Sequence, residues 1–329
     1  MTNEHGQKVA AIIYNPVKAE RSELKELAAR YDEGYSEIHW KETTEEDPGY
    51  SQAQKAVSEG ADVVIACGGD GTVRLVAAAL ANTDSSLGIV PAGTGNLLAR
   101  NLKLKPGFEE AMQVALQGED RPIDICYAEV DRPDTANEKI PFVVMAGVGI
   151  DAQMIENTDD DLKAKIGFLA YGVAIAKSLK GGDRIKLLRR IDRGRWQSAR
   201  AHSVIVGNCG DLVNNITLLP NAIPDDGKLD VVIMRPKGIF GWINIFGQMA
   251  YQMVQKLVYT LRGRGEEKDG EDNNSKSLRY LQGKQIDIKF SHTEDFEVDG
   301  DPAGRADGFS VTVDPAALSV RVPRGSVGE

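Results

Sequence analysis

The chain contains 329 residues, of which 42% are hydrophobic and 27% are charged, figures typical of a globular protein with about two domains. Its formal net charge of −10 disfavours a broadly basic nucleic-acid-binding protein, so we expect no nucleic-acid partner. The three cysteines, Cys67, Cys126 and Cys209, form no Cys-x-x-Cys pair, which argues against a zinc knuckle or a disulfide framework. We expect them to pack in the interior of a cytosolic protein.

The sequence contains no run of the roughly 18 to 20 apolar residues that a membrane-spanning helix requires. The polar residues 1–9 include no apolar segment of the kind found in signal peptides, so we expect a cytoplasmic protein. In the most apolar stretch, Gly238–Leu261, polar residues such as Gln248, Gln252 and Gln255 recur every three or four positions, as on one face of an amphipathic helix. Such a helix could pack against the core or lie in a membrane interface, and the sequence leaves both open.

Short β-branched runs alternate with helical patterns from Val9 to about Glu129. The pattern predicts strands at Val9–Tyr14, Asp62–Ala66 and Leu87–Pro91, and helices near Glu20–Arg30, Tyr50–Glu59, Thr72–Ala81 and Phe108–Gln117. Strands separated by crossover helices predict a parallel sheet covered on both faces. We therefore expect an α/β domain over residues 1–135.

From about Ile140 the strand-like runs become shorter, with turn residues between them. They are Phe142–Ala146, Ser203–Val206, Val231–Met234, Ile286–Phe290 and Val311–Val313. This pattern predicts a mainly antiparallel, β-rich domain over residues 136–329, whose final strand could pack back on the first domain. We also expect helices near Leu162–Leu179 and Phe240–Leu261, and a mobile loop at Arg262–Ser277, which contains no large apolar residue.

Two glycine-rich turns each follow a predicted strand and precede a predicted helix. They are Gly68-Gly69-Asp70-Gly71-Thr72 and Pro91-Ala92-Gly93-Thr94-Gly95-Asn96. Glycines allow the backbone to approach a ligand closely, and the amides at a helix N-terminus can face phosphate. Because the carboxyl ends of parallel strands share one edge of a sheet, the two turns predict a nucleotide site. Neither turn matches a Walker A loop or a complete Gly-x-Gly-x-x-Gly motif.

These turns resemble those of the diacylglycerol kinase catalytic family, which includes bacterial lipid kinases, sphingosine kinases and ceramide kinases. Five further segments resemble family motifs in the same order: Tyr14-Asn15-Pro16, Gly147–Asp151, Lys165–Tyr171, Pro224–Asp230 and Val298–Asp301, the first of these continuing as Val17-Lys18-Ala19. The resemblance covers nearly the whole chain. It implies a two-domain kinase that holds ATP between an α/β domain resembling NAD kinase and phosphofructokinase and a β-rich domain.

Carried over residue by residue, the resemblance implies a set of nucleotide contacts: Asn15, Pro16, Thr44, Gly68, Gly69, Asp70, Gly71, Thr72, Gly93, Thr94 and Asn96. It places Asp70 and Asp124 in the acidic network around a catalytic Mg²⁺. Asp226, with the carbonyls of Ile223 and Lys228, resembles a separate structural Mg²⁺ site.

Two departures from the family are visible. Where the family often has Ser-Gly after Asn-Pro-x, this chain has Lys18-Ala19, so the phosphate turn loses a glycine and gains a cation. Leu97 stands where many bacterial members have an acidic residue. The metal network could therefore be smaller here than in those relatives.

The implied reaction is transfer of the ATP γ-phosphoryl group to a lipid hydroxyl, with diacylglycerol the leading acceptor and phosphatidic acid the product. A carboxylate must accept the hydroxyl proton, and Asp299 is the preferred base, with Asp301 as the alternative. Asp299-Gly300 would equally suit a tight hairpin turn. Other hypotheses remain open: a sphingoid or other lipid kinase, a small-molecule kinase related to NAD kinase, or a non-catalytic nucleotide- or lipid-binding protein.

A basic segment interrupts the acidic chain. Between Lys177 and Arg200 there are nine basic and two acidic residues, a local charge of +7 that leaves −17 for the rest. Each basic residue near an anionic membrane contributes about 1 kcal/mol of attraction. The segment could hold the protein at the inner face of a membrane, where its lipid substrate lies, or be a solvated strand and turn. Pairing of edge strands would also allow a homodimer.

Overall fold

The computed structural model describes residues 8–149, 184–212, 216–236 and 277–326, together with residues 241, 244, 245 and 247. Several predictions fall wholly or almost wholly outside these residues and are not tested: Asp151, the segment Lys165–Tyr171, the helices at 162–179 and 240–261, the loop 262–277, and Lys177 and Lys180 of the basic segment. Among the described residues, no helix is both long and apolar enough to span a membrane.

The N-terminal part forms the predicted parallel sheet, with the strand order β4-β3-β1-β2. Its strands are β1 (Lys8–Tyr14), β2 (Tyr35–Glu42), β3 (Val63–Gly68) and β4 (Ser86–Pro91). Alternate residues of β1 enter two different hydrophobic clusters, Ile13 on one face and Ile12 on the other. Because both faces are buried there, β1, β3 and β4 are nearly continuous hydrophobic runs, which is why the sequence predicted these three strands.

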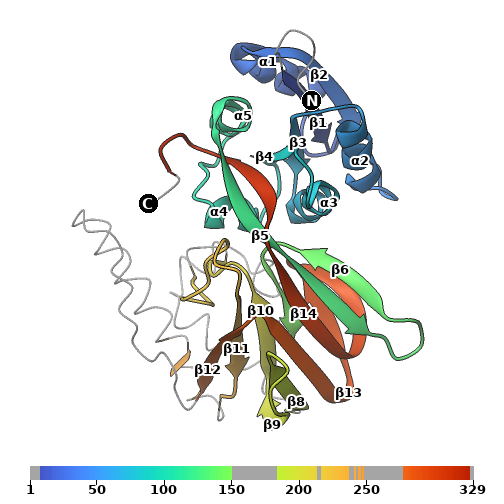
Figure 1. The fold of residues 1–329 in the computed structure, drawn as a ribbon, viewed down its shortest axis with the longest axis vertical. Coiled ribbons are helices and arrows are strands. Elements are labelled where there is room, and N and C mark those ends of the chain that lie inside the picture. The colour runs from blue at the N-terminus through green and yellow to red at the C-terminus, as the bar shows by residue number, and fades with distance from the viewer. Residues whose placement is uncertain are drawn as a thin grey trace, which may run out of the picture.

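Helices cover both faces of this sheet (Figure 1). They are α1 (Arg21–Tyr31), α2 (Tyr50–Ser58), α3 (Asp70–Leu80), α4 (Leu97–Asn101) and α5 (Phe108–Gln117). Buried residues of α1 and α5 pack on one face, and those of α2, α3 and α4 pack on the other. The sequence did not predict β2, because this edge strand is largely polar and only partly buried.

The C-terminal part is antiparallel, as predicted. Its strands are β5 (Glu119–Asp131), β6 (Glu138–Phe142), β7 (Met145–Val148), β8 (Ile185–Ile191), β9 (Gln197–Ala201), β10 (Ser203–Gly207), β11 (Leu229–Met234), β12 (Leu278–Gly283), β13 (Gln285–Val298) and β14 (Asp301–Val322). The prediction of one strand at Phe142–Ala146 was wrong. The chain there ends β6 and begins β7, and the break at Val143 and Val144 turns two amides toward the site described below.

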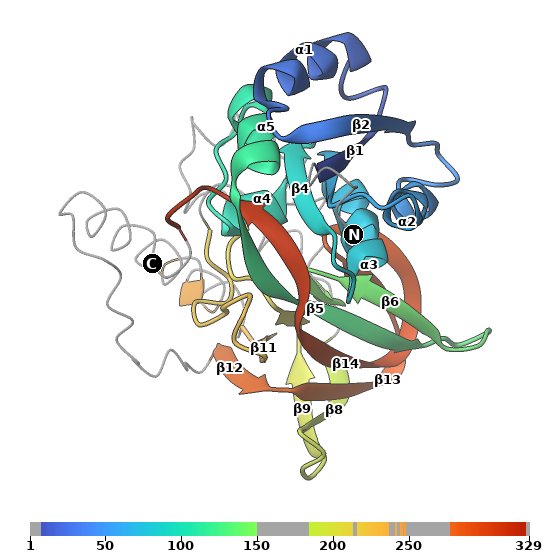
Figure 2. The same cartoon turned by 45° about the horizontal axis from the view of Figure 1, so that its top comes forward.

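Two long strands connect the two parts of the molecule (Figures 1 and 2). β5 and β14 pair from Asp131–Gly308 at one end to Glu119–Val322 at the other. Near its end β14 also lies parallel to β4, with Val320 opposite Leu87, so the final strand contacts the parallel sheet. A single sheet path therefore runs from β12 to β2.

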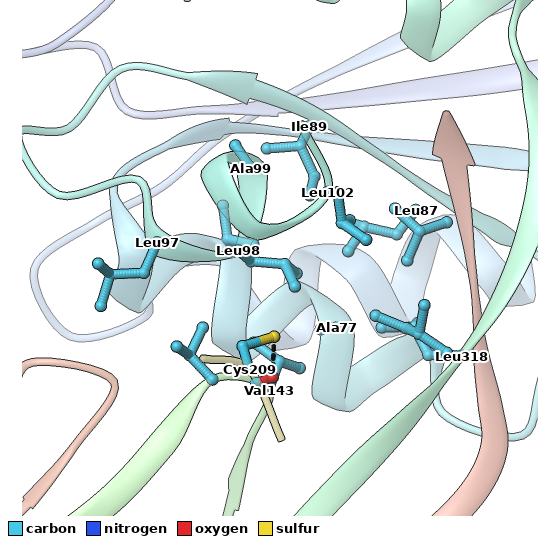
Figure 3. Packing of buried hydrophobic residues seen from close by; sticks show 14 of the residues in the cluster. Ala77, Leu87, Ile89, Leu97, Leu98, Ala99, Leu102, Val143, Cys209 and Leu318 are labelled. Atoms are coloured by element: carbon cyan, nitrogen blue, oxygen red, sulfur yellow. Dashed lines mark hydrogen bonds between the residues drawn. The ribbon is translucent and has the colours of Figure 1, made fainter. Parts of the chain in front are cut away.

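A continuous core joins the domains where helix α4 meets the β domain. Figure 3 shows Leu97 and Leu98 of α4 beside Val143 and Cys209, and the Cys209 thiol donates a hydrogen bond of 3.5 Å to the Val143 carbonyl. All three cysteines are buried and free, which confirms their packing role. Burial raises the pKa of the Cys67 thiol to about 12.

Gly88 provides a test of the packing between β4 and α5. A Cβ atom at this position would lie 2.8 Å from the Ala115 Cβ and 3.0 Å from the Ile65 Cγ1. Gly88→Ala should therefore lower the free energy of unfolding by about 1–3 kcal/mol, measured by urea denaturation.

The double variant Gly88→Ala/Ala115→Gly removes the contacting methyl group. Ala115→Gly should therefore cost less in the Gly88→Ala background than in the wild type. Strictly additive effects would contradict the proposed contact.

Candidate active site

Most of the predicted nucleotide contacts meet at the carboxyl edge of the parallel sheet. Asn15 follows β1, Thr44 lies two residues beyond β2, and the two glycine-rich turns follow β3 and β4. The Asn15 amide donates to the Cys67 carbonyl at 3.0 Å, which ties the Asn-Pro segment to the first glycine-rich turn. Pro16 and Thr44 are exposed at this edge. The structure thus brings together segments that lie far apart in the chain.

The two glycine-rich turns touch through their glycines. A Cβ atom on Gly93 would lie only 2.7 Å from the Cα of Gly69, so a side chain here would force the turns apart. The Ala92 amide also donates to the Gly68 carbonyl at 2.9 Å. These glycines are therefore needed for a backbone approach, which is the role that the sequence pattern suggests.

Asp70 fastens the second turn to the first. Its carboxylate accepts hydrogen bonds from the amides of Asn96 at 2.8 Å and Leu97 at 2.6 Å, which are otherwise unpaired at the start of α4. Asn96 adopts a left-handed conformation with φ of 48°, and its side chain bonds both the amide and the carbonyl of Gly93. Asp70 is thus a structural bridge at the centre of the site, a role that the sequence did not predict.

The two threonines of the turns have different surroundings. Thr72 is 6% exposed, and its hydroxyl lies 2.7 Å from the position of a Cβ on Gly68, so its side chain packs over its own turn. Thr94 is exposed. Of these two predicted contacts, Thr94 is the one that a nucleotide can reach in this conformation.

Lys18 lies over the first glycine-rich turn. Its ammonium Nζ is 2.9 Å from the position that a Cβ on Gly69 would occupy, and the side chain is exposed. Within the described part of the chain no carboxylate pairs with it. The cation that this chain has in its Asn-Pro segment is therefore directed at the predicted phosphate site.

Asp301 faces the same site from the β domain. Its Oδ2 lies 2.9 Å from the position of a Cβ on Gly71 and 3.3 Å from the guanidinium of Arg74 on α3. Half of its side chain is exposed. Arg74 was missed from the sequence, although it lies one helical turn after Asp70, and this spacing could have identified it.

Asp299, unlike the half-exposed Asp301, is buried and bound to backbone amides. Asp299 (φ 50°) and Gly300 (φ 87°) form a two-residue hairpin turn between β13 and β14, which confirms the turn interpretation of this dipeptide. The Asp299 carboxylate is 2% exposed and accepts hydrogen bonds of 2.9–3.1 Å from the amides of Val143, Val144 and Met145. A catalytic base must reach the acceptor hydroxyl. The geometry therefore favours Asp301 as the candidate base, whereas the sequence favoured Asp299.

Burial dominates the titration of Asp299. Desolvation raises the pKa of its carboxyl to about 6, although Arg74 and the three amides act in the opposite direction. Asp299 also donates its own amide to the Met145 carbonyl at 2.8 Å. Its role in this conformation is to fix the hairpin turn that carries Asp301.

Asp124 lies with the Asp226 turn. It is 1% exposed, and its two oxygens accept hydrogen bonds from the amides of Gly227 at 2.7 Å and Ala316 at 2.8 Å. Burial raises the pKa of this carboxyl, and Asp226 and Asp225 act in the same direction. Because Asp70 has different partners, a shared Mg²⁺ network of the two carboxylates stays a prediction, and the geometry gives Asp124 a structural role.

The segments predicted to hold a structural Mg²⁺ do form one turn. The Asp226 amide lies 3.4 Å from the Ile223 carbonyl, and the Asp226 carboxylate accepts the Lys228 amide at 3.0 Å. The Lys228 ammonium lies 3.5 Å from the same carboxylate and already supplies a positive charge. In the described ranges, no three His, Cys, Asp or Glu side chains cluster as metal ligands. A metal here stays a prediction.

A small apolar cavity adjoins the hairpin turn. It has a volume of about 50 Å³, and its walls include Leu97, Met145, Val148, Ile205, Leu218 and Gly300. Leu97, which replaces an acidic residue of many relatives, therefore contributes apolar surface beside the site.

Asp299→Asn should change the pH dependence of stability. A carboxyl whose pKa is raised from 3.8 to about 6 stabilises the fold below pH 3.8 and loses that contribution as the pH rises through 6. The full contribution is about 3 kcal/mol, of which about 2 kcal/mol falls between about pH 4.5 and pH 7.5. The difference in unfolding free energy, wild type minus variant, should decrease by that amount in urea titrations. A constant difference would contradict the assigned environment.

Comparison with known proteins agrees with the two-part fold. Residues 9–128 match the family described as "Diacylglycerol kinase catalytic domain", and residues 143–322 match the "YegS C-terminal NAD kinase beta sandwich-like domain". The chain is 29% identical over 299 residues to the Cronobacter sakazakii protein named "Probable lipid kinase YegS-like", covering 89% of this chain and 88% of the relative. A protein of the same name from Klebsiella pneumoniae is 28% identical over 318 residues, with 95% of each chain covered.

A solved structure shares the fold. The crystal structure of a diacylglycerol kinase from Bacillus anthracis superposes with a TM-score of 0.68 at 21% identity, covering 96% of this chain and 97% of that one. The two family matches together extend over both domains, and the second alone exceeds half of the chain. The chain therefore belongs to the diacylglycerol kinase catalytic-domain family, with a YegS-type, NAD kinase-like β-sandwich as its second domain.

Proposed function

We propose that the protein is an ATP- and Mg²⁺-dependent lipid kinase that phosphorylates a lipid hydroxyl, with diacylglycerol as acceptor and phosphatidic acid as product. One observation carries this proposal: Asp301 lies against Gly71 of the glycine-rich turn, beside an apolar cavity. A phosphate cradle, an accessible carboxylate and an apolar wall are the parts that transfer to a lipid alcohol requires.

The glycine-rich turns would bind the phosphates of ATP. Amides at the N-terminus of α3, an 11-residue helix, favour negative charge, and the Lys18 ammonium adds a cation over Gly69. Thr94, which is exposed, and Asn15, which is partly buried, lie at the same edge. The phosphates are thereby oriented toward the β domain, where Asp301 lies.

The donor set at the turns fits a magnesium ion. Asp70 and Asp301 supply carboxylate oxygens, which Mg²⁺ prefers together with phosphate oxygens and water. Bound Mg²⁺ would neutralise charge on the phosphate oxygens.

Asp301 would accept the acceptor's proton. The lipid hydroxyl attacks the γ-phosphorus, a new oxygen–phosphorus bond forms, the bond to ADP breaks, and the hydroxyl proton passes to the Asp301 carboxylate. The ion pair with Arg74 holds that carboxylate toward Gly71, and the buried Asp299 holds the turn. Because the acceptor is a membrane lipid, we place the enzyme in the cytoplasm at the inner face of the membrane.

The reaction can be tested with γ-labelled ATP, Mg²⁺ and a panel of acceptors dispersed in detergent micelles. The panel contains diacylglycerol, monoacylglycerol, sphingosine, ceramide, a prenol and NAD. We expect label to enter diacylglycerol most rapidly. Labelling of NAD alone would instead favour a small-molecule kinase, and an entirely unlabelled panel would refute the kinase assignment.

Asp301→Asn should lower kcat by about 10²–10⁴-fold, the usual contribution of a positioned base, with little change in stability. Asp295→Asn is a matched control, because that side chain is 92% exposed on the preceding strand. If Asp301→Asn kept its activity while a folded Asp299→Asn variant lost it, the base would be Asp299 after all.

Lys18→Met should raise the KM for ATP by about tenfold or more, because a hydrogen bond to a charged group contributes about 1.5–3 kcal/mol. The KM for the lipid should stay unchanged, and Lys18→Arg should recover part of the loss. Lys25→Met, at an exposed position of α1, is the matched control. An unchanged KM for ATP in Lys18→Met would remove Lys18 from the phosphate site.

A further inference from the structure

A second cavity lies on the β domain, outside the site described above. It has a volume of about 940 Å³ and is formed by strands β8, β9 and β13 with the end of β11. We call it the cationic groove, and its five basic residues are Arg184, Lys186, Arg200, Arg235 and Lys289. None of the described residues that line it is acidic.

The charges of the groove repel one another across the strands. Lys186 of β8 stands directly opposite Arg200 of β9, and like charges in this position destabilise a sheet. Within the described part of the chain, none of the five basic side chains forms an ion pair with a carboxylate. The fold thus keeps an unfavourable arrangement that a bound anion would relieve.

A buried arginine adds to the positive charge. Arg189, in the middle of β8, is only 5% exposed, and its pKa is lowered by burial and by the neighbouring Arg279 and Arg235. The Nε atoms of Arg189 and Arg235 are buried and have no hydrogen-bond partner. Arg189 does donate one hydrogen bond of 2.7 Å to the Gln197 side-chain oxygen, but a buried N–H group without an acceptor is costly, so these two unsatisfied Nε atoms favour an anionic ligand nearby.

Apolar side chains lie among the cations. Leu188 is 44% exposed and Trp196 is 38% exposed, two of the four large hydrophobic side chains that are exposed in the described part. The centre of the Trp196 ring lies 4.7 Å from the Arg190 Cζ and 5.5 Å from the Lys289 Nζ. Leu188 stands opposite Lys289 in the sheet register. Tryptophan and leucine between cations are typical of a membrane interface.

We propose that the cationic groove and the adjoining Leu188 and Trp196 form a docking surface for the anionic phospholipids of a bilayer. The β8–β9 hairpin extends from the end of the β domain that lies away from the α/β domain (Figures 1 and 2). Charge complementarity selects an anionic partner, and the exposed apolar side chains favour a bilayer over a soluble polyanion. This inference rests on the proposed function and names the membrane partner of the same enzyme.

The test uses the full chain and sedimentation with vesicles of phosphatidylcholine, with and without about 30% phosphatidylglycerol, in the absence of ATP. The wild type should bind only the anionic vesicles, and less strongly as salt is added. Lys186→Glu/Arg200→Glu should lower the partition coefficient by about thirtyfold or more, since each lost cation removes about 1 kcal/mol. Lys55→Glu/Lys105→Glu, two exposed positions of the α/β domain, is the matched control and should bind as the wild type does.

Insertion of Trp196 has its own readout. Brominated lipids should quench wild-type tryptophan fluorescence, and Trp196→Phe should abolish most of this quenching. Equal vesicle binding by the charge-reversal variant and the wild type would overturn the proposal. Full competition by soluble glycerophosphate would also overturn it, because the groove would then take a free phosphate.

These outcomes are independent of the kinase activity. If the enzyme labels micellar diacylglycerol but its binding to vesicles does not depend on the charges of the groove, only the docking surface is contradicted. A protein that docks through the groove but labels no acceptor contradicts only the proposed function.

Discussion

The site depends on the two hydrogen bonds that the Asp70 carboxylate accepts, because they hold two separate glycine-rich turns together as one surface. Parallel pairing of β3 with β4 brings the turns to the same edge, and the contact of Gly69 with Gly93 brings their backbones together. Neither feature fixes the start of α4, whose first amides would be unpaired without a carboxylate. Asp70 therefore acts as a helix cap from a distance, and a residue expected to contact nucleotide and metal also builds the phosphate cradle.

Hydrogen bonds of the same kind, from backbone amides to a carboxylate, order the part of the β domain that faces this cradle. Asp299 accepts three amides at the break between β6 and β7, and this fixes the hairpin turn whose last residue, Asp301, reaches α3. The long pairing of β5 with β14 and the core around α4 make the two domains continuous (Figure 3). The position of Asp301 thus depends on backbone contacts that are distant from it in sequence.

Local pattern accounts for what could be predicted from the sequence. Buried strands and amphipathic helices of the α/β domain have strong periodicity, and the glycine-rich turns have few other uses, so both were recognised. The roles of Asp70, Asp124 and Asp299 could not be predicted, because the amides that they accept belong to segments far away in the chain. Edge strand β2 and the split between β6 and β7 were missed because exposure and a two-residue break weaken the alternating pattern. Lys18 was noticed as a cation, but only the fold shows that it lies over Gly69.

The distribution of charge over the surface is likewise visible only in the fold. A net charge of −10 suggests little affinity for membranes, yet the fold gathers five basic side chains in one groove of the β domain. The central claim, however, concerns the cradle. Amide hydrogen exchange with and without a non-hydrolysable ATP analogue and Mg²⁺ tests it most directly. The account predicts slower exchange in both glycine-rich turns, at residues 69–72 and 93–97. Protection confined to one turn, or found only elsewhere, would contradict a single phosphate cradle bridged by Asp70.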